Sequence, residues 1–285
     1  MELQTRVLSK EQLDFFNREG YVIVKNVWSS EEIEKLKKFF REKFKSEFWK
    51  VSPYNSPTII NDIYRHFPEL IDVIFKPKYI DAIKDILGEN LICMPECSIH
   101  YNRFFDWHKD TTHMDANGGN IHHSGKSFLV QSGVYFQDNS PEGGGLTVVP
   151  GSMRNTDRFV KMHYGGLSDR VYNKLLKVLG RSAFQQIDKN EKPVDIPTKA
   201  GDLLIFNNKL DHRATFLRGR NGKAITPKKE KFAIFNTFGN DKALMNEYLE
   251  SMRSLDESYS KYLRQTTSAP VVVKKAEELR FSLCY

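Results

Sequence analysis

The stretch DWHKD, residues 106–110, places a histidine and an aspartate two residues apart between segments that are typical of β-strands. Residues two apart on a strand point to the same face of a sheet, so the side chains of His108 and Asp110 can enter one cavity. An imidazole nitrogen and a carboxylate oxygen together suit a borderline divalent cation. Because His-x-Asp is a common sequence, the alternative for an isolated pair is a surface salt bridge.

A third ligand is available in His212, which follows the largely apolar segment 201–211. Two histidines and one carboxylate on one face form the ligand set of non-haem Fe(II) oxygenases. His212 is far from His108 along the chain, so the two can meet only if the intervening strands close into a double-layered sheet. A double-stranded β-helix, a form of jelly roll, achieves this.

Hydrophobic periodicity predicts helices towards both ends of the chain and strands in its middle. Ser9 stands three residues before Gln12, a capping-box pattern that begins a helix, and Gly88 is placed to end another. We expect helices over residues 9–19, 29–44, 57–67, 77–90 and 241–263. We expect strands within residues 21–28, 91–104, 126–138, 144–152, 192–208, 211–216 and 231–239.

These elements predict a mainly β fold with flanking α-helices, around a double-stranded β-helix (jelly roll, cupin-like) core. A single domain over residues 1–285 is expected, because all-β domains often use roughly 200–250 residues. In this division residues 1–90 form a mainly helical N-terminal flank, residues 91–240 the β core, and residues 241–285 a C-terminal helical segment and tail.

The composition is that of a globular protein, with 40% hydrophobic and 28% charged residues. No apolar stretch approaches the roughly 20 residues that span a bilayer, and the first residues lack a signal-peptide pattern, so we expect no membrane partner and a cytoplasmic location. Three cysteines without zinc-finger spacing fit reduced thiols.

The net charge of +7 is compatible with binding to nucleic acid, to an anionic membrane or to a small acidic substrate. Much of the excess lies in residues 209–231, where aromatic residues are not interleaved as stacking platforms. A solvated basic loop is therefore favoured, and a nucleic-acid partner is not expected.

Four segments, in this order and spacing, resemble the phytanoyl-CoA dioxygenase family of Fe(II)- and 2-oxoglutarate-dependent oxygenases. They are LSKEQLDFFNREGYVIVKNVWSSEEIEKLK at 8–37, WHKD at 107–110, GGGLTVVPGSMR at 143–154 and GDLLIFNNKLDH at 201–212. The resemblance runs from the first expected helix almost to Gly239.

The resemblance implies that His108, Asp110 and His212 bind Fe(II) and act as the catalytic centre, with 2-oxoglutarate and O2 as cosubstrates. Oxidative decarboxylation to succinate and CO2 would yield a ferryl species that abstracts hydrogen from a substrate C–H bond, and hydroxylation is the usual outcome. Related halogenases carry a small residue at the carboxylate position, so the presence of Asp110 favours hydroxylation.

The distal carboxylate of 2-oxoglutarate needs a cationic partner. The family places an arginine at the start of the strand after the distal histidine, where this chain carries Lys231, so Lys231 is the expected anchor and Arg218 or Arg220 are alternatives. Asn102 matches a family asparagine near the cosubstrate, although an edge-strand amide is an equal alternative. Gln131, on the expected inward face of its strand, is a further candidate.

Substrate contacts are expected after the metal ligand, because residues 111–127 are too long for a hairpin turn and long loops often bind ligands. Thr111, Met114 and the inward-facing His100 are the candidates, the last with a buried structural histidine as alternative. Adjacent His122 and His123 do not predict a second metal, because neighbouring side chains on an extended segment diverge.

The expected reaction is hydroxylation of an unactivated C–H bond of a small polar or anionic metabolite. The same ferryl chemistry giving desaturation, cyclisation or demethylation is one alternative. A macromolecule-modifying protein, or a non-catalytic jelly-roll binding protein, is an alternative of another class. The sequence does not predict the oligomeric state.

Overall fold

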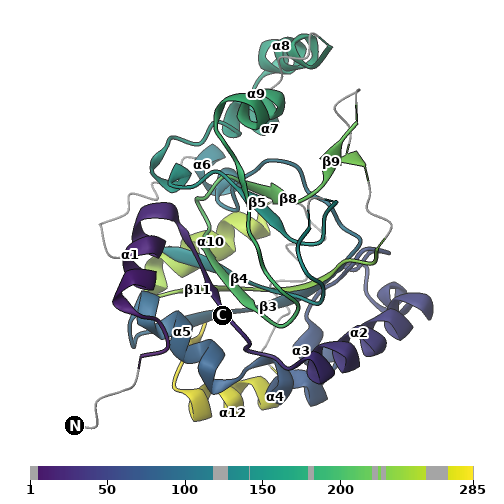
Figure 1. The fold of residues 1–285 in the computed structure, drawn as a ribbon, viewed down its shortest axis with the longest axis vertical. Coiled ribbons are helices and arrows are strands. Elements are labelled where there is room, and N and C mark those ends of the chain that lie inside the picture. The colour runs from purple at the N-terminus through teal and green to yellow at the C-terminus, as the bar shows by residue number, and fades with distance from the viewer. Residues whose placement is uncertain are drawn as a thin grey trace.

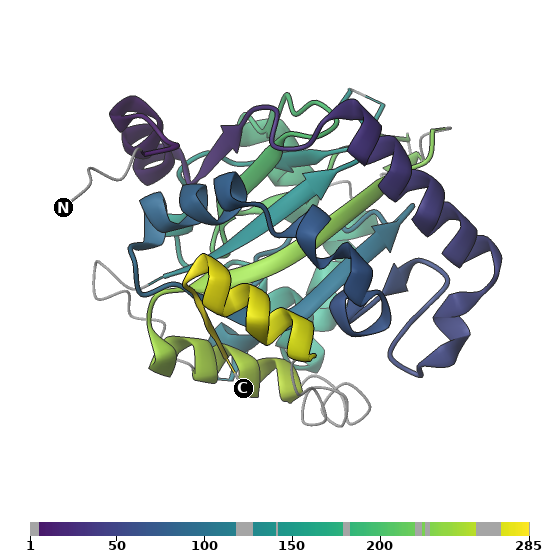
Figure 2. The same cartoon turned by 90° about the horizontal axis from the view of Figure 1, so that it is seen from below.

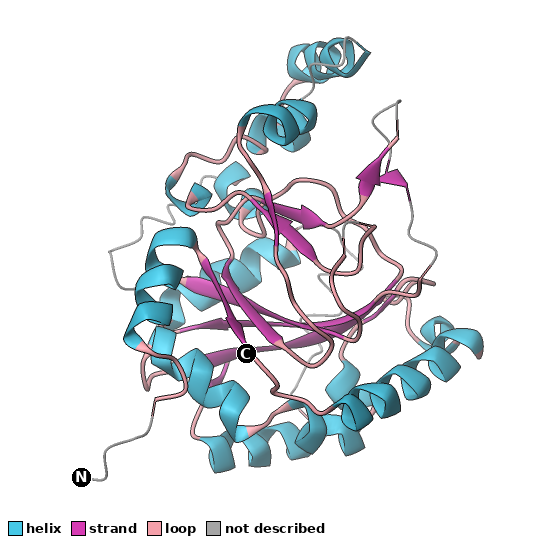
Figure 3. Cartoon of the chain, in the orientation of Figure 1, coloured by secondary structure: helices cyan, strands magenta, loops and turns pink. Residues whose placement is uncertain are grey.

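In a computed structural model of the chain, the structure describes residues 6–117, 128–140, 142–178, 183–219, 224–225, 229–254 and 269–284. Figure 1 shows a central β-structure with helices packed below it and a group of helices standing at the opposite end. Figure 3 shows the same division by type of element. The expected fold class is confirmed by this arrangement, in which a large sheet and a small sheet form the β core.

The N-terminal elements follow the local sequence signals. Helix α1 (Lys10–Glu19) begins at Ser9, whose side chain forms a capping box with Gln12. Strand β1 (Tyr21–Val24) comes next, and a second capping box between Ser29 and Glu32 begins α2 (Ser30–Lys45). Both caps satisfy backbone N–H groups that the first helical turn leaves without partners.

The large sheet has seven strands in the order β1-β7-β4-β11-β3-β12, with β2 pairing the edge of β3. Its long central strands alternate in direction, and Ile234 of β11 pairs with Val134 of β4 on one side and Ile99 of β3 on the other. The strand bounds are β2 Ile59–Ile60, β3 Ile92–Tyr101, β4 Leu129–Tyr135, β7 Leu203–Asn207, β11 Phe232–Gly239 and β12 Ser282–Leu283.

The small sheet faces the large one and has the order β6-β5-β8. Its strands are β5 (Leu146–Val148), β6 (Val194–Asp195) and β8 (His212–Ala214), and a separate pair is formed by β9 (Leu217–Arg218) and β10 (Ala224–Ile225). A buried cluster that includes Tyr135, Leu146 and Phe206 joins residues of both sheets. The two layers are those of the expected double-stranded β-helix.

Helices cover the other face of the large sheet, as Figure 2 shows. The largest buried cluster lies there and combines helical residues such as Phe40 and Tyr79 with strand residues such as Ile99 and Phe232. These helices are α2, α3 (Ile63–His66), α4 (Ile71–Ile74), α5 (Pro77–Leu87) and α12 (Pro270–Leu279). None of the helices that the structure describes is long and apolar enough to cross a membrane.

The remaining elements are helical. Helices α7 (Val160–Tyr164), α8 (Leu167–Val178) and α9 (Ala183–Asn190) lie between β5 and β6 in the chain and form the group at the top of Figure 1. The others are η1 (Phe48–Val51), η2 (Pro68–Leu70), α6 (Thr112–Ala116), η3 (Ser152–Arg154) and α10 (Lys242–Arg253).

Two expectations differ from the structure. Residues 57–67 were expected to be one helix, but Ile59 and Ile60 pair with the edge of β3 and only Ile63–His66 are helical. Asp62, with φ +53°, separates the two conformations. The DWHKD segment is likewise no regular strand, because only His108 forms an isolated bridge.

The helices α7–α9 were not anticipated at all, and α12 was covered only by the expected helical segment and tail over residues 241–285. The flanks also enter the β core, since β1 and β12 are strands of the large sheet. The single domain, and its division at residues 90 and 240, stay predictions.

Gly201 gives a test of how tightly the turn before β7 is constrained. It has φ +88°, and a Cβ atom there would lie 2.4 Å from the carbonyl oxygen of Trp28. We expect Gly201→Ala to lower the free energy of unfolding by more than the roughly 1–2 kcal/mol that left-handed backbone costs an L-residue. Urea denaturation measures this, with Gly151→Ala as control because Gly151 also has a left-handed backbone (φ +75°), but a Cβ atom there would meet nothing closer than 3.5 Å. Equal losses in the two variants would contradict a steric contribution at Gly201.

Candidate metal centre and cosubstrate pocket

The backbone brings the two histidines together. His108 lies between β3 and α6, and His212 begins β8. Each backbone N–H donates to the other residue's carbonyl oxygen, with an N···O distance of 3.0 Å in both directions. Asp110 is held in the same way, because its N–H donates to the carbonyl oxygen of Asn208. The two histidine rings therefore lie on the same side of this short pairing, with centroids 4.2 Å apart.

The three expected ligands form one group. Oδ1 of Asp110 lies 3.7 Å from Nε2 of His108 and 3.6 Å from Nε2 of His212. One ligand atom from each residue lies within 4.8 Å of the others. A single ion between the three atoms is thus compatible with the positions of all three side chains.

Backbone carbonyls orient both imidazoles. Nδ1 of His108 donates to the carbonyl oxygen of Asp106 at 2.6 Å, and Nδ1 of His212 donates to that of Leu210 at 2.9 Å. A proton on Nδ1 leaves the Nε2 lone pair of the neutral ring directed towards Asp110. This is the arrangement in which histidine binds a metal.

Burial sets the protonation states. It lowers the pKa of His108 and of His212 to about 4, so both rings are neutral at pH 7. It raises the pKa of Asp110 to about 6, and Oδ2 of Asp110 is buried with no hydrogen-bond partner. A buried carboxylate without a partner is costly, and a bound divalent cation would remove that cost. The donor set and its electrostatics fit Fe(II).

A small cavity of about 100 Å³ adjoins the triad. Its walls come from both sheets, and the residues that define it here are His108, Asp110, Gln131, Tyr135, His212 and Lys231. Gln131 accepts a hydrogen bond from Thr237 through Oε1, so its carboxamide position is fixed in the wall.

Lys231 is a buried cation in this cavity. Its side chain donates from Nζ to the carbonyl oxygen of Arg103 at 3.1 Å, and it has no carboxylate partner among the described residues. Burial lowers the pKa of Lys231 to about 7. The hydroxyl of Tyr135, in the same cavity, is buried without a hydrogen-bond partner. A cation without a carboxylate partner and a hydroxyl without a hydrogen-bond partner fit the carboxylate of a bound anion.

A large cavity of about 660 Å³ opens on the other side of the triad. It is defined by residues from several elements: Tyr54, Asn61, His113, His163, Tyr164 and Tyr248. His100, Phe105, His108, Asp110, Gln131 and Phe235 line both cavities. The triad therefore stands where the two cavities meet.

The structure separates the other candidates into those that line a cavity and those that do not. His100 lines both cavities, packs with its ring centroid 4.9 Å from that of Phe235, and stays neutral because burial lowers its pKa to about 3. Asn102 lines neither; its Oδ1 accepts from the backbone N–H of Lys231. Thr111 and Met114 are buried outside both cavities, Met114 in an apolar cluster.

The alternative anchor Arg218 does not line the small cavity. Arg218 pairs with Asp106 at 2.6 Å and also contacts Asp188. Arg220 and the pair His122 and His123 lie outside the described residues.

Sequence reasoning missed several cavity residues. Tyr135 could have been found, because it shares strand alternation with Gln131. Arg103 and Phe105 follow β3 in irregular backbone, and His163 and Tyr164 belong to the unexpected helix α7. No periodic signal marks these four.

A double-stranded β-helix with a His-x-Asp and distal His triad beside a basic pocket defines the class of Fe(II)- and 2-oxoglutarate-dependent oxygenases. The phytanoyl-CoA dioxygenase (PhyH) family model matches residues 16–220, and the chain belongs to this family. The protein is thus an enzyme of the Fe(II)/2-oxoglutarate-dependent oxygenase class. A comparison with curated proteins finds no match.

Solved structures share the fold at low identity. EctD from S. alaskensis, solved with 2-oxoglutarate and 5-hydroxyectoine, is 18% identical, with a TM-score of 0.56 over 84% of this chain and 78% of that chain. HygX from Streptomyces hygroscopicus, solved with nickel and 2-oxoglutarate, is 18% identical, with a TM-score of 0.56 over 82% and 87%. SnoK, a carbocyclase from nogalamycin biosynthesis, is 18% identical, with a TM-score of 0.57 over 82% and 84%.

The pKa of Lys231 gives a pH prediction. Below pH 7 the ammonium form is present and attracts a carboxylate; above pH 7 it is lost. We expect affinity for 2-oxoglutarate, measured calorimetrically with Co(II) in place of iron, to weaken up to about tenfold per pH unit from about pH 7 to pH 9. Lys231→Arg keeps its charge across this range and should show little dependence. The same slope in both proteins would assign the effect to another group.

Lys231 should also limit the stability of the ligand-free protein. A buried ammonium without a carboxylate partner is destabilising, so Lys231→Met is expected to raise the free energy of unfolding by on the order of 1 kcal/mol while abolishing 2-oxoglutarate binding. Guanidinium denaturation and calorimetry measure the two effects. Lys84→Met is the control, because Lys84 in α5 is similarly buried but has a carboxylate partner in Glu89, besides donating to the carbonyl oxygen of Leu279. Its loss should lower stability and leave binding unchanged.

Proposed function

We propose that the enzyme hydroxylates a C–H bond of a small molecule, with His108, Asp110 and His212 as iron ligands. In the balanced reaction, the substrate, O2 and 2-oxoglutarate give the hydroxylated product, succinate and CO2. The observation that carries the assignment is the position of the triad between a small cavity with a buried cation and a large cavity. Iron bound there would activate O2, which oxidises both the substrate and 2-oxoglutarate.

In this proposal Lys231 and Tyr135 hold the distal carboxylate of 2-oxoglutarate. Both polar groups are buried, and neither has an acidic partner among the described residues. Asn102 supports them indirectly, since its carboxamide and backbone both hydrogen-bond the backbone of Lys231. Gln131 lies between the two cavities and would orient the cosubstrate relative to the metal. The small residue Ala214 also lines the pocket and leaves it open on that side.

The large cavity is the proposed substrate site, and its walls favour a neutral molecule. The expectation of an anionic substrate drew on the basic residues around the site. Lys109 is the only lysine or arginine among the described residues that line the large cavity, and its ammonium group pairs with Asp211. Arg213 pairs with Asp188. The remaining polar groups of the wall are mainly neutral hydroxyl, carboxamide and imidazole groups.

The volume of the large cavity and its aromatic side chains narrow the class of substrates that we propose. A volume of about 660 Å³ lies within the range of sites that hold drug-sized ligands. Tyr54, Tyr164, Tyr248 and Phe235 offer ring faces and edges to such a ligand. We therefore propose a neutral substrate that carries a ring system and several oxygen functions. The cytoplasmic location stays part of the proposal, and the three buried cysteines, which form no disulfide, agree with a reducing compartment.

The cofactor assignment is tested by anaerobic titration of the apoprotein with Fe(II) and 2-oxoglutarate. We expect the weak visible charge-transfer band of the iron chelate, and its loss in His108→Ala and Asp110→Ala because each removes a ligand. Thr111→Ala is the matched control, since Thr111 is buried beside Asp110 but outside both cavities. Iron binding without the band would contradict the proposed cosubstrate, and wild-type absorption in both ligand variants would contradict the assigned ligands.

Substrate choice is then tested by succinate release from a panel of neutral ring compounds and matched anionic analogues. Turnover of the neutral members, with a product heavier by one oxygen atom, is the expected result. Products that lose two hydrogen atoms would show desaturation or ring closure instead. Preference for the anionic members would contradict the neutral-substrate proposal while leaving the metal site intact.

A further inference from the structure

The ligand-bearing ribbon, defined as residues 107–109 paired with residues 211–213, has two different faces. His108 and His212 occupy the face towards the metal site. Their neighbours alternate to the opposite face, as cross-strand geometry requires. There Lys109 lies across from Asp211, and the guanidinium of Arg213 lies 5.2 Å from the centroid of the Trp107 ring.

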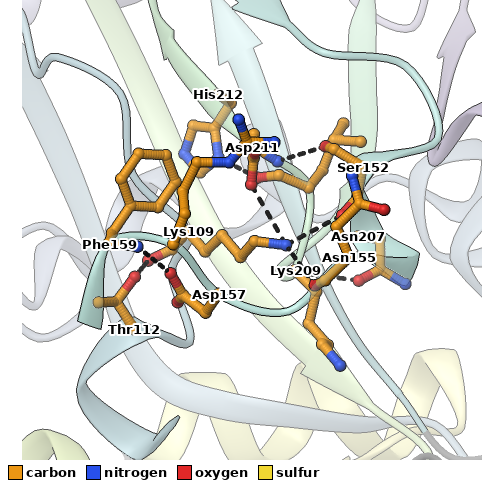
Figure 4. Close-up of polar contacts among 12 residues, drawn as sticks. Lys109, Thr112, Ser152, Asn155, Asp157, Phe159, Asn207, Lys209, Asp211 and His212 are labelled. Carbon is orange, nitrogen blue, oxygen red and sulfur yellow. Dashed lines mark hydrogen bonds and ion pairs between the residues drawn. The ribbon is translucent and has the colours of Figure 1, made fainter. Parts of the chain in front are cut away.

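The Lys109–Asp211 pair is completely buried. Nζ of Lys109 lies 3.2 Å from Oδ1 of Asp211, and neither side chain is exposed to solvent. The same ammonium donates to the carbonyl oxygens of Ser152 and Asn155, at 3.0 and 3.2 Å. The Ser152 hydroxyl accepts from the backbone N–H of Asp211. Figure 4 shows these contacts converging behind His212.

A second cation completes the charge balance. Arg158 lies 3.1 Å from Oδ2 of Asp211 and also pairs with Glu191, which follows α9. Two positive and two negative side chains therefore form one network, and its only fully buried members are Lys109 and Asp211. The network connects both segments of the ribbon to η3 through Ser152, and to the end of α9 through Arg158 and Glu191.

Stability alone does not account for such a pair. Removing two charges from water costs about as much as their attraction returns, and a buried ion pair can often be replaced by apolar residues without loss of stability. Its contacts do fix geometry, however, because the ammonium group donates to two carbonyl oxygens and lies against the Asp211 carboxylate at a set position. Those contacts hold Lys109, which lies between His108 and Asp110, and Asp211, which precedes His212.

We propose that the Lys109–Asp211 ion pair is a positioning device for the metal site, which rests on the proposed function of the triad. It holds the segment that carries His108 and Asp110 at a fixed distance from His212, so the three ligand atoms are assembled before a metal binds. Preassembly lowers the ordering cost of metal binding, and outer residues that orient ligands typically contribute 10–100-fold to metal affinity. Neither residue takes part in the reaction itself.

Two variants separate positioning from stability. Asp211→Asn keeps the size of the side chain and removes its charge. The double variant Lys109→Met with Asp211→Leu removes both charges and leaves Arg158 paired with Glu191. Lys84→Met is the matched control for losing a buried lysine far from the site.

The measurement is Co(II) binding by calorimetry, with the visible ligand-field spectrum as a second readout, beside urea denaturation of the metal-free proteins. We expect Co(II) affinity to fall about 10–100-fold in both variants, with an altered spectrum. The double variant should keep stability near that of the wild type. The control should bind Co(II) as the wild type does.

Wild-type affinity and spectrum in the folded double variant would overturn the inference and leave the ion pair a packing feature. If that variant does not fold, wild-type affinity in Asp211→Asn has the same meaning. Failure of the wild type itself to bind Co(II) would instead remove the proposed metal site. The two failures are therefore distinguishable.

Discussion

The chemistry of this protein depends on one short piece of backbone pairing, the mutual hydrogen bonds between His108 and His212. These residues are distant in the chain, and only the closure of the small sheet over the large one brings them into register. Once paired, both rings fall on one side and Asp110 follows two residues later. The surrounding strands and helices serve to hold this pairing in a buried place.

Burial leaves two charged side chains of opposite sign in the site, each without a counter-charge beside it in the described part of the chain. Asp110 is a buried carboxylate whose Oδ2 has no hydrogen-bond partner, and Lys231 is a cation without a carboxylate partner among the described residues. Each charge is costly while the site is empty. A divalent metal ion would neutralise the Asp110 carboxylate, and a dicarboxylate would neutralise the Lys231 ammonium group. Both charges lower the free energy of unfolding of the ligand-free protein, and neutralising them contributes to the free energy of binding. Such a loss of stability in favour of function is common at functional sites.

Local signals in the sequence predict much of the fold, whereas the proposed metal ligands were predicted from residue type, spacing and the family resemblance. The serine caps, Gly88 and the alternating strands act through neighbouring residues, so they can be recognised without knowing the tertiary structure. The helix expected at 57–67 failed because the edge of β3 offers Ile59 and Ile60 better backbone partners. Likewise, the role of Lys109 depends on contacts across the fold, and no local pattern encodes it. The resemblance to the phytanoyl-CoA dioxygenase family identified Lys231 as the expected anchor. Residue propensity alone would predict only a solvated lysine in a loop.

The burial of the cysteines has a consequence for an enzyme that handles oxygen at iron. Thiolates, not thiols, are the form that oxidants attack. Burial raises the pKa of Cys93 and of Cys284, which keeps both sulfur atoms protonated. The thioethers of Met94 and Met252 line the large cavity beside the proposed iron site. An oxidant released by turnover without substrate would therefore meet these two methionines, whose oxidation reductases can reverse, whereas the protonated thiols of Cys93 and Cys284 are poor targets.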